Sequence, residues 1–331
     1  KGTTISVAKS LGWKVKDDEV LSGEELKNLS DEELLSIIPN IKIFVRVTPE
    51  DKLRIGKLYQ SLGEVVSMTG DGVNDAPALK AMDIGISLGS GSDVAKSAAD
   101  MVLLDDNFQT ISLSIVEGRK ILTNIRKTFV YLMSNSLDEV LVVGGSLLMG
   151  LPIPLTALQI IWVNLFTGSL PALAFAFDDN IDNRKISKSF SSKIIFTNEV
   201  KVLTFGIGLL TSLLLFFVYY GLIFFNVELG LAKSVFFVCF ASYILVAAYS
   251  FRNLHNSLFS YPVFSNMKLN ISVAIAFIIL IITITAPVFQ NIFGLTSIPF
   301  VWIWFVIMWL ILNVLLVEGA KYFFRKGWFL F

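Results

Sequence analysis

The hydrophobic positions of this 331-residue chain change their pattern near residue 120. Before it, short apolar runs alternate with amphipathic segments, which predicts strands alternating with helices. After it, apolar stretches of about 20 residues follow one another, the length that a bilayer core requires. The expected spans are 128–150, 152–177, 202–225, 234–251, 269–289 and 298–317. The pattern thus predicts a soluble domain with its stalk at 1–120 and a six-helix transmembrane domain at 121–331.

The first 120 residues predict an α/β domain. A helix is expected to start at Thr48. Thr48 is a favourable N-cap residue, Pro49 follows at the first helical position, and an acid lies three residues past the cap. Ser22 and Ser30 each precede acidic residues and predict two short capped surface helices. Alternating strands and helices imply a parallel sheet covered on both faces. The strands are expected at 41–47, 64–68, 83–88 and 101–104, and the other helices at 49–62, 74–82 and 94–99.

Composition places the chain in the membrane class, since 54% of its residues are hydrophobic and 28 are Phe. The 27 basic residues equal the 27 acidic ones, which argues against a nucleic-acid partner. The single cysteine, Cys239, lies in an apolar run, so a disulfide framework is excluded and a packing role is expected.

Basic residues predict the orientation of the spans. The side opposite the soluble domain holds only Lys233, whereas basic residues are frequent in the loops of the starting side and in the tail. Such an imbalance predicts that both termini of this sequence and the soluble domain are cytoplasmic. The basic residues of the starting side are Arg119, Lys120, Arg126, Lys127, Arg184, Lys185, Lys188, Lys193, Lys201, Arg252, Lys268, Lys321, Arg325 and Lys326.

The densest group of polar residues lies at Thr69–Pro77, where an apolar strand ends, a glycine-flanked turn follows and a helix begins. In an open parallel sheet, ligands bind outside the carboxyl ends of the strands. Asp71 and Asp75 therefore lie where oxygen ligands would hold a hard cation such as Mg²⁺. The alternative is that Gly and Asp simply form a turn.

Two further residues suit a phosphate at the same place. Asn74 can hydrogen-bond a phosphoryl oxygen, and the N-terminus of the helix that follows favours negative charge. Lys52, on the preceding helix, could supply a positive charge to the same site.

Polar residues inside the first expected span are candidates for function, because ionisable groups are costly in a bilayer. Asn135 and Ser136 lie three or four positions before Glu139, on one helix face with it. Asp138 points about 100° away from Glu139 around the helix.

The second expected span carries Asn164 and Thr167 on one face, followed by Pro171. A proline frees backbone carbonyls that could coordinate an ion. The alternative for these side chains is polar contact between helices, which is common in membranes.

The string TGDGVNDAPALKAMDIGISLGSGSDVAKSAADMVLLDDNF, residues 69–108, resembles the hinge and phosphorylation-domain segment of P-type ATPases. The resemblance extends over essentially the whole chain. It implies a haloacid-dehalogenase-like Rossmann half-domain followed by an α-helical six-span bundle, the use of ATP and Mg²⁺, and an aspartyl-phosphate intermediate.

The resemblance also implies roles for single residues. Asp71 would ligate the catalytic Mg²⁺, and Asp75 and Asn74 would support the metal and the phosphate. Lys52, within the matching TPEDK, would contact the phosphoryl group, with Thr69 and Gly70 also placed at the cofactor. Positioning and charge neutralisation of this kind dominate phosphoryl transfer.

One part of the family's machinery is absent from the sequence. The nucleophile of P-type ATPases is the Asp of an Asp-Lys-Thr-Gly-Thr motif, and this string does not occur here. The nucleophile, the nucleotide-binding and actuator domains and four membrane helices are therefore expected before residue 1, and the chain alone is expected to be inactive. Its expected partners are ATP, the transported cation, the lipid bilayer and the N-terminal part of the same pump, without nucleic acid.

The first two spans resemble the fifth and sixth helices of calcium pumps and their bacterial relatives. Carried over by position, Ser136, Glu139, Asn164 and Thr167 fall where cation ligands occur. Calcium pumps usually have an Asp at the position of Gly168 and an Asn at that of Ser136. Fewer carboxylates leave less charge to replace the hydration of a divalent ion. Calcium in a plasma (inner) membrane is expected from the resemblance, with a proton or monovalent cation pump as the alternative.

Two other classes of protein would account for part of the sequence. A membrane-anchored dehalogenase-type phosphatase would use the same Asp71 and Asp75, but it gives no reason for Glu139 or Asn164 within the spans. A non-catalytic membrane subunit would need a start codon near residue 1, where the sequence has none.

Overall fold

The computed structural model describes residues 2–10, 12–178 and 195–326. The chain divides into two compact units, with the boundary between Val116 and Glu117. The basic residues at 184, 185, 188 and 193 that entered the orientation argument lie outside the described residues.

The first unit alternates short strands and helices, as the sequence predicts. Its elements, in chain order, are α1 Gly2–Ser10, β1 Val20–Ser22, α2 Gly23–Lys27, α3 Asp31–Ile37, β2 Ile43–Val45, α4 Pro49–Ser61, β3 Ser67–Gly70, α5 Ala76–Ala81, β4 Ile84–Leu88, α6 Asp93–Ala98 and β5 Met101–Leu103.

All strand pairs in this unit are parallel, but they form two sheets. The strands β1 and β2 pair with Val20 opposite Ile43. The second sheet has the order β3-β4-β5, with Thr69 opposite Ile86 and Ile86 opposite Met101. The predicted strand type and direction are confirmed, and the single expected sheet is replaced by two small ones.

Helix starts follow the capping signals. The Thr48 hydroxyl accepts from the Asp51 N–H at 3.2 Å, and the Asp51 carboxylate accepts from the Thr48 N–H at 2.8 Å. Burial alone raises the pKa of Asp51, but hydrogen bonds from the Thr48 amide and hydroxyl outweigh it, so this pKa lies below its usual value. Ser22 and Ser30 cap α2 and α3 in the same way.

The second unit is helical. Its elements are α7 Phe108–Leu148, which begins in the first unit, α8 Ala157–Trp162, the π-helical segment η4 Val163–Ser169, α9 Leu170–Phe175, α10 Asn198–Lys201, the π-helical η5 Val202–Ile207, α11 Gly208–Phe224, α12 Leu229–Phe251, α13 Met267–Thr285, α14 Pro287–Phe293 and α15 Val301–Arg325.

Five helical stretches among the described residues are long and apolar enough to cross a membrane: Ala157–Phe175, Asn198–Phe224, Leu229–Phe251, Met267–Thr285 and Val301–Arg325. They correspond to the second to sixth expected spans. The first, 128–150, falls in the C-terminal part of α7 and is not among them. Its polar residues, such as Asp138 and Glu139, lower its mean hydropathy. Among the described residues, length and hydropathy thus support five of the six expected spans.

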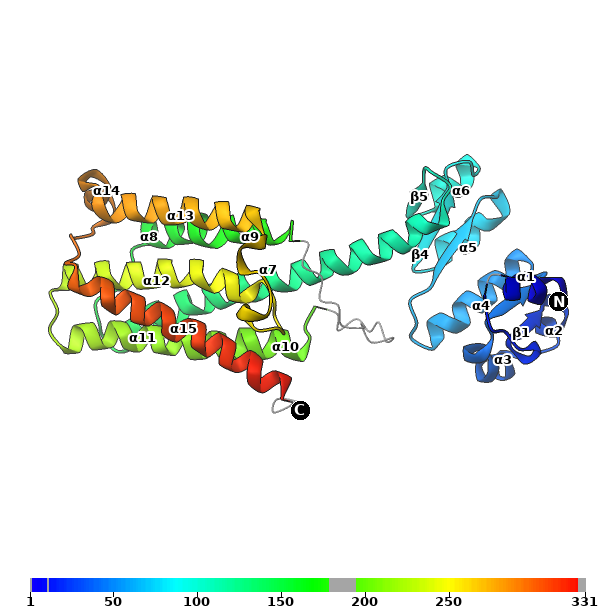
Figure 1. The fold of residues 1–331 in the computed structure, drawn as a ribbon, viewed down its shortest axis with the longest axis horizontal. Coiled ribbons are helices and arrows are strands. Elements are labelled where there is room, and N and C mark those ends of the chain that lie inside the picture. Colours follow the sequence, from blue (N-terminus) through cyan, green and yellow to red (C-terminus); the bar gives the residue numbers. More distant parts are fainter. Residues whose placement is uncertain (1, 11, 179–194, 327–331) are drawn as a thin grey trace. The chain divides into compact units, whose positions relative to one another are not determined.

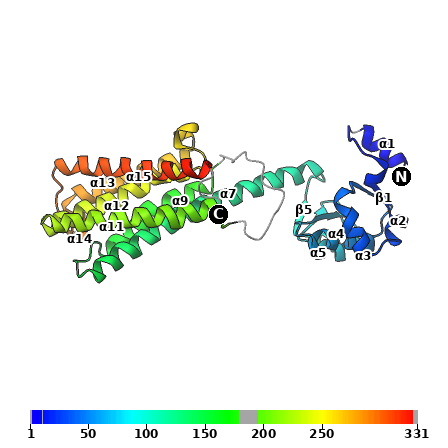
Figure 2. The same ribbon diagram turned by 90° about the horizontal axis from the view of Figure 1, so that it is seen from below.

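The centre of this bundle is α12. In its most apolar 18-residue stretch 83% of the helix is buried, compared with 28% for α13 and 22% for α15. It contacts α11, α13 and α15 (Figures 1 and 2). The fully buried rings of Phe236, Phe237 and Phe240 fill the space around it. Since α12 is apolar all round, it suits an interior position, whereas α13 and α15 keep apolar surface exposed.

Candidate functional site

The loop after β3 brings Lys52 and Asp75 together. β3 ends at Gly70, the 3₁₀ turn Val73–Asp75 follows, and α5 begins at Ala76. Lys52 Nζ of α4 lies 3.1 Å from Asp75 Oδ1, and the Gly72 N–H donates to Asp75 Oδ2 at 3.3 Å. The Asp75 carboxylate therefore orients the lysine and closes the loop.

Two glycines allow this loop to fold tightly. A Cβ at Gly70 would lie 2.5 Å from the Asp75 Cβ, closer than side chains tolerate. A Cβ at Gly91 would lie 3.2 Å from the carbonyl oxygen of Asp71 and 2.9 Å from Ser87 Oγ. The next residue, Ser92, donates its N–H to that Asp71 carbonyl at 2.8 Å. The sequence reasoning missed Gly91 and Ser92; the signal was the Gly-Ser-Gly-Ser run after the neighbouring strand.

Asp71 and Asn74 are exposed at this strand end. The Asp71 carboxylate has no hydrogen bond or ion pair with any described residue, and Thr69 lies in β3 opposite Ile86. Within the described ranges no group of three or more His, Cys, Asp or Glu could hold a metal ion. Mg²⁺ commonly uses one or two carboxylates and completes its shell with waters and phosphate oxygens. The Asp71 carboxylate is free to serve as such a ligand, whereas the Asp75 carboxylate is already paired with Lys52. This arrangement fits Mg²⁺.

In the helical unit, the structure brings two of the four expected cation ligands together. Asn164 Nδ2 of η4 donates to Glu139 Oε1 of α7 at 2.7 Å. The other two make contacts within their own helices: Thr167 Oγ1 donates to the Val163 carbonyl at 2.7 Å and Ser136 Oγ to the Leu132 carbonyl at 3.1 Å.

The helix is irregular around Asn164. Residues Val163–Ser169 are π-helical, and Ser169 Oγ donates to the Asn164 carbonyl five residues earlier at 2.8 Å. Pro171 has no N–H for the Thr167 carbonyl one turn before it. The hydroxyl of Tyr131, a fully buried residue of α7, donates to that carbonyl. The sequence indicated Pro171, but it did not indicate that the Tyr131 hydroxyl would donate to the carbonyl that the proline leaves without an N–H. Single π turns inside helices are frequent at functional sites.

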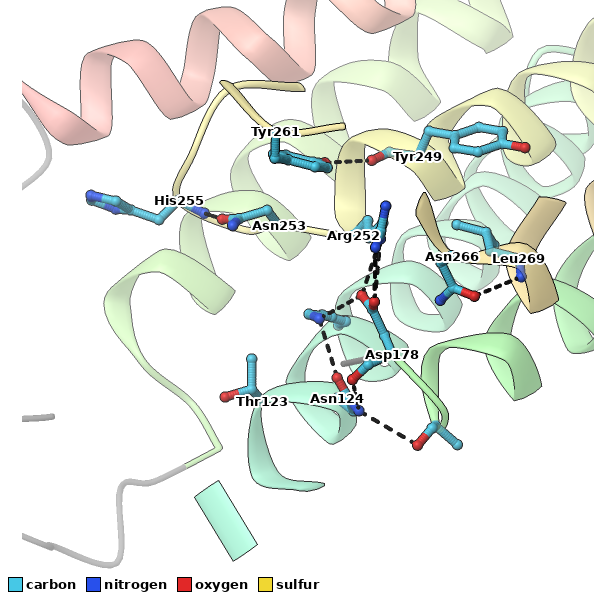
Figure 3. Close-up of polar contacts among 12 residues, drawn as sticks. Thr123, Asn124, Asp178, Tyr249, Arg252, Asn253, His255, Tyr261, Asn266 and Leu269 are labelled. Carbon is cyan, nitrogen blue, oxygen red and sulfur yellow. Dashed lines mark hydrogen bonds and ion pairs between the residues drawn. The ribbon is translucent and has the colours of Figure 1, made fainter. Parts of the chain in front are cut away.

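A buried charge network at one end of the bundle was also missed (Figure 3). Asp178, after α9, accepts from Lys127 Nζ of α7 at 2.9 Å and from Arg252 Nη2 at 3.1 Å. Their side chains are 1%, 2% and 4% exposed. Asn124 Nδ2 donates to the Asp178 carbonyl at 3.0 Å, and Asn124 Oδ1 accepts from Lys127. The network ties α7 to the segments that follow α9 and α12.

Comparison with known proteins gives a family match for each of the two units, in agreement with the resemblance seen in the sequence. Residues 152–323 match the family described as "Cation transporting ATPase, C-terminus", and residues 53–115 match "haloacid dehalogenase-like hydrolase". The chain is 38% identical over 314 residues to calcium-transporting ATPase 1 of Bacillus cereus, covering 89% of this chain and 35% of the relative.

Other relatives agree with these matches. Identity is 39% over 303 residues to the calcium-transporting ATPase of Bacillus subtilis (89% of this chain, 34% of the relative). It is 34% over 299 residues to human calcium-transporting ATPase type 2C member 1 (89% and 32%). The chain thus spans about one third of the length of these relatives.

The dehalogenase-like fold of the first unit and the apolar helices of the second agree with these matches. The chain is a multi-pass membrane protein, and it belongs to the cation-transporting ATPase family, whose C-terminal region it contains.

Proposed function

We propose that this chain is the C-terminal part of an ATP-driven P-type pump that moves Ca²⁺ across a membrane through an aspartyl-phosphate intermediate. The observation that carries the proposal is the Glu139–Asn164 contact between α7 and η4, in a chain that also holds the Lys52–Asp75 loop. A carboxylate and an amide oxygen between apolar helices are oxygen ligands of the kind that calcium prefers.

The phosphoryl side of the reaction is assigned to the loop after β3. Asp71 would hold Mg²⁺, which supplies charge neutralisation at the phosphoryl group when bound. Lys52 presents its ammonium to the phosphoryl oxygens and is oriented by Asp75 at 3.1 Å. Asn74 and the Thr69–Gly70 strand end border the same site. The nucleophilic aspartate and the ATP-binding residues would come from a part of the pump that this sequence does not contain.

A proton or monovalent cation is the second candidate cargo. The observation in its favour is that Gly168 lies next to Thr167 in η4 and adds no carboxylate beside Glu139 and Asn164. A single carboxylate balances a monovalent charge better than a divalent one. The lipid bilayer would be the plasma (inner) membrane, with the soluble unit in the cytoplasm as the basic residues predict.

The phosphoryl assignment is tested in the full-length pump by acid-stable phosphoenzyme formation from ATP. Asp71→Asn removes a charged ligand while keeping the size of the side chain, so the phosphoenzyme should fall about a hundredfold. Glu228→Gln, an exposed acid at the start of α12, is the matched control and should leave it unchanged. Wild-type phosphorylation in Asp71→Asn would contradict the assignment.

The cargo is tested by measuring ATPase activity against a panel of ions. Stimulation by Ca²⁺ alone supports a calcium pump, and stimulation by a monovalent ion or by acid pH supports the second candidate. In Glu139→Gln the stimulating ion should lose its effect. Unaltered stimulation and ion affinity in that variant would make Glu139 a structural residue.

A further inference from the structure

A cavity lies beside the Asp178 network, at the end of the bundle where α9 and α12 finish and α13 begins. Its volume is about 490 Å³, and the residues that line it include Asp178, Arg252, Asn266 and Lys268, all in the helical unit. Ligand pockets commonly have volumes of about 300–1,000 Å³. None of the described lining residues belongs to the proposed cation or phosphoryl sites, so the cavity is a separate feature of the bundle.

Asn266 presents an unused hydrogen-bond donor at this cavity. The residue is 7% exposed and caps α13, because its Oδ1 accepts from the Leu269 N–H at 3.0 Å. This bond fixes the orientation of the side-chain amide, and Nδ2 lies on the side of Arg252 and Asp178 (Figure 3). Nδ2 is buried, and no described residue accepts its hydrogens. Since a buried donor without an acceptor is destabilising, the site fits a ligand with acceptor atoms.

The start of α13 adds further donors. The first four N–H groups of an α-helix have no acceptor within the helix. Those of Leu269 and Asn270 bond to the side chain and the carbonyl of Asn266, at 3.0 Å each. The N–H groups of Met267 and Lys268 have no acceptor in the described part of the chain. Free N–H groups and the helix dipole together favour an anion at this end of α13.

The acid that lines the cavity is already paired with cations. Asp178 accepts from Lys127 and from Arg252, at 2.9 and 3.1 Å. Arg252 Nη1 also donates to the Pro262 and Val263 carbonyls, at 3.1 and 2.8 Å, which holds the guanidinium in place at the cavity. The Asp178 carboxylate is therefore taken up by the network and does not balance a further cation.

Lys268 is that further cation. Its Nζ lies 3.7 Å from the centre of the Phe177 ring, and it forms no ion pair with an acid among residues 2–10, 12–178 and 195–326. A water molecule could satisfy the Asn266 amide, but it would not balance the Lys268 charge. A ligand that does both carries acceptor oxygens and negative charge, as a phosphate group does.

Exposed apolar side chains border the cavity. Leu173 and Phe177, four residues apart, are exposed in and just after α9, and Met267 and Ile271, also four apart, are exposed on α13. Residues at this spacing share a helix face. α9 and α13 lie side by side (Figure 1). A phospholipid combines a phosphate with acyl chains, so it matches both the polar cavity and the apolar faces beside it, and basic pockets between membrane helices bind anionic head groups.

We propose that this cavity binds a phosphate group, and that a phospholipid of net negative charge supplies it. The phosphate oxygens accept from Asn266 Nδ2 and from the N–H groups at the start of α13. The Lys268 ammonium balances the negative charge, and the acyl chains lie along the exposed faces of α9 and α13. The bound lipid thus ties the segments after α9 and α12 to the start of α13. This site is independent of the proposed pump activity.

The test measures lipid binding to the full-length protein in detergent by native mass spectrometry, without ATP. Phosphatidylglycerol should bind more tightly than phosphatidylcholine, which has the same phosphate but a cationic group that cancels its charge. Lys268→Gln removes an exposed charge and should weaken phosphatidylglycerol binding about fivefold. Asn266→Asp keeps a favourable N-cap residue but replaces the donor with an anionic oxygen, so binding should weaken at least about tenfold.

The matched control is Lys326→Gln. Lys326 is an exposed lysine whose Nζ lies 5.8 Å from the centre of the Tyr322 ring, after the last turn of α15, and its replacement should leave binding unchanged. A readout local to the cavity is hydrogen exchange at the Met267 and Lys268 amides, which phosphatidylglycerol should slow in the wild type and in Lys326→Gln. It should slow them less in Asn266→Asp.

Inorganic phosphate, added in place of lipid, distinguishes the two sources of the phosphate group. A lipid adduct that both cavity variants weaken supports a phospholipid, and a phosphate adduct that both weaken supports a soluble phosphate at the same site. Equal binding of both probes in the wild type, Lys268→Gln and Asn266→Asp would overturn the proposal, and so would an equal loss of binding in Lys326→Gln. A wild-type protein that binds phosphatidylglycerol but forms no phosphoenzyme from ATP would contradict the proposed function alone.

Discussion

The network around Asp178 gives a quantitative prediction for Asp178→Asn. The change keeps the shape of the side chain but removes a carboxylate that contacts both Lys127 and Arg252. At a separation of about 6 Å, two unit positive charges repel each other by about 3 kcal/mol at an effective dielectric of 20. Removing one partner of a buried ion pair typically costs about 3–5 kcal/mol. We expect the free energy of unfolding to fall by that amount.

The assay is reversible unfolding of the chain in mixed detergent micelles. Glu228→Gln, exposed in the same unit, should change the free energy of unfolding by less than about 0.5 kcal/mol. Lys127→Met combined with Asp178→Asn should be more stable than Asp178→Asn alone, because one of the two buried cations is gone. A loss below about 1 kcal/mol in Asp178→Asn, or no recovery in the double variant, would refute this account of the network.

Three further changes test other parts of the structure. Gly70→Ala places a Cβ 2.5 Å from that of Asp75 and should lower phosphoenzyme formation in the full pump at least about tenfold. Gly118→Ala, which has open space around it, should leave phosphoenzyme formation unchanged. Equal phosphoenzyme formation in the two variants would refute the close packing at Gly70. Pro171→Ala supplies an N–H for the Thr167 carbonyl one turn earlier, so the amide at 171 should be protected in hydrogen exchange, and an unprotected amide would refute the view that this carbonyl lacks a helical donor because of the proline. The pKa of Asp83 is lowered by hydrogen bonds from the Val66 amide and the Gln60 side chain, so its contribution to stability is complete above the unfolded value near 4 and is lost as the pH falls through the folded pKa. Asp83→Ala should therefore lower the melting temperature at pH 7 and match the wild type near pH 2; a pH-independent difference would refute this role.

Local signals predicted the elements of the first unit well. The caps at Thr48, Ser22 and Ser30 depend on residues three apart in sequence, and each forms as expected. The loop at Asp71 was found because glycines and acids after an apolar strand are a local pattern. The division into two sheets was not predicted, since strand pairing is decided by contacts between distant segments.

In the helical unit, too, local patterns were predicted from the sequence, whereas contacts between distant segments were not. The sequence named Glu139 and Asn164 as separate candidate cation ligands, and only the structure shows that Asn164 Nδ2 donates to Glu139 Oε1. Ser136 and Thr167 bond to their own helices. Helix geometry also predicted that Asp138 faces away from Glu139.

By itself, then, the sequence determined the α/β and helical units, the glycine- and aspartate-rich loop after β3, the family and the acids within α7, because these follow from periodicity, turn chemistry and motif. Only the tertiary structure decided that Asp138 meets Ser212, 74 residues later, and that Asp178 joins Lys127 to Arg252. A hydrogen bond or buried ion pair requires atoms within about 3 Å, and which helices bring distant residues that close depends on the packing of the whole bundle.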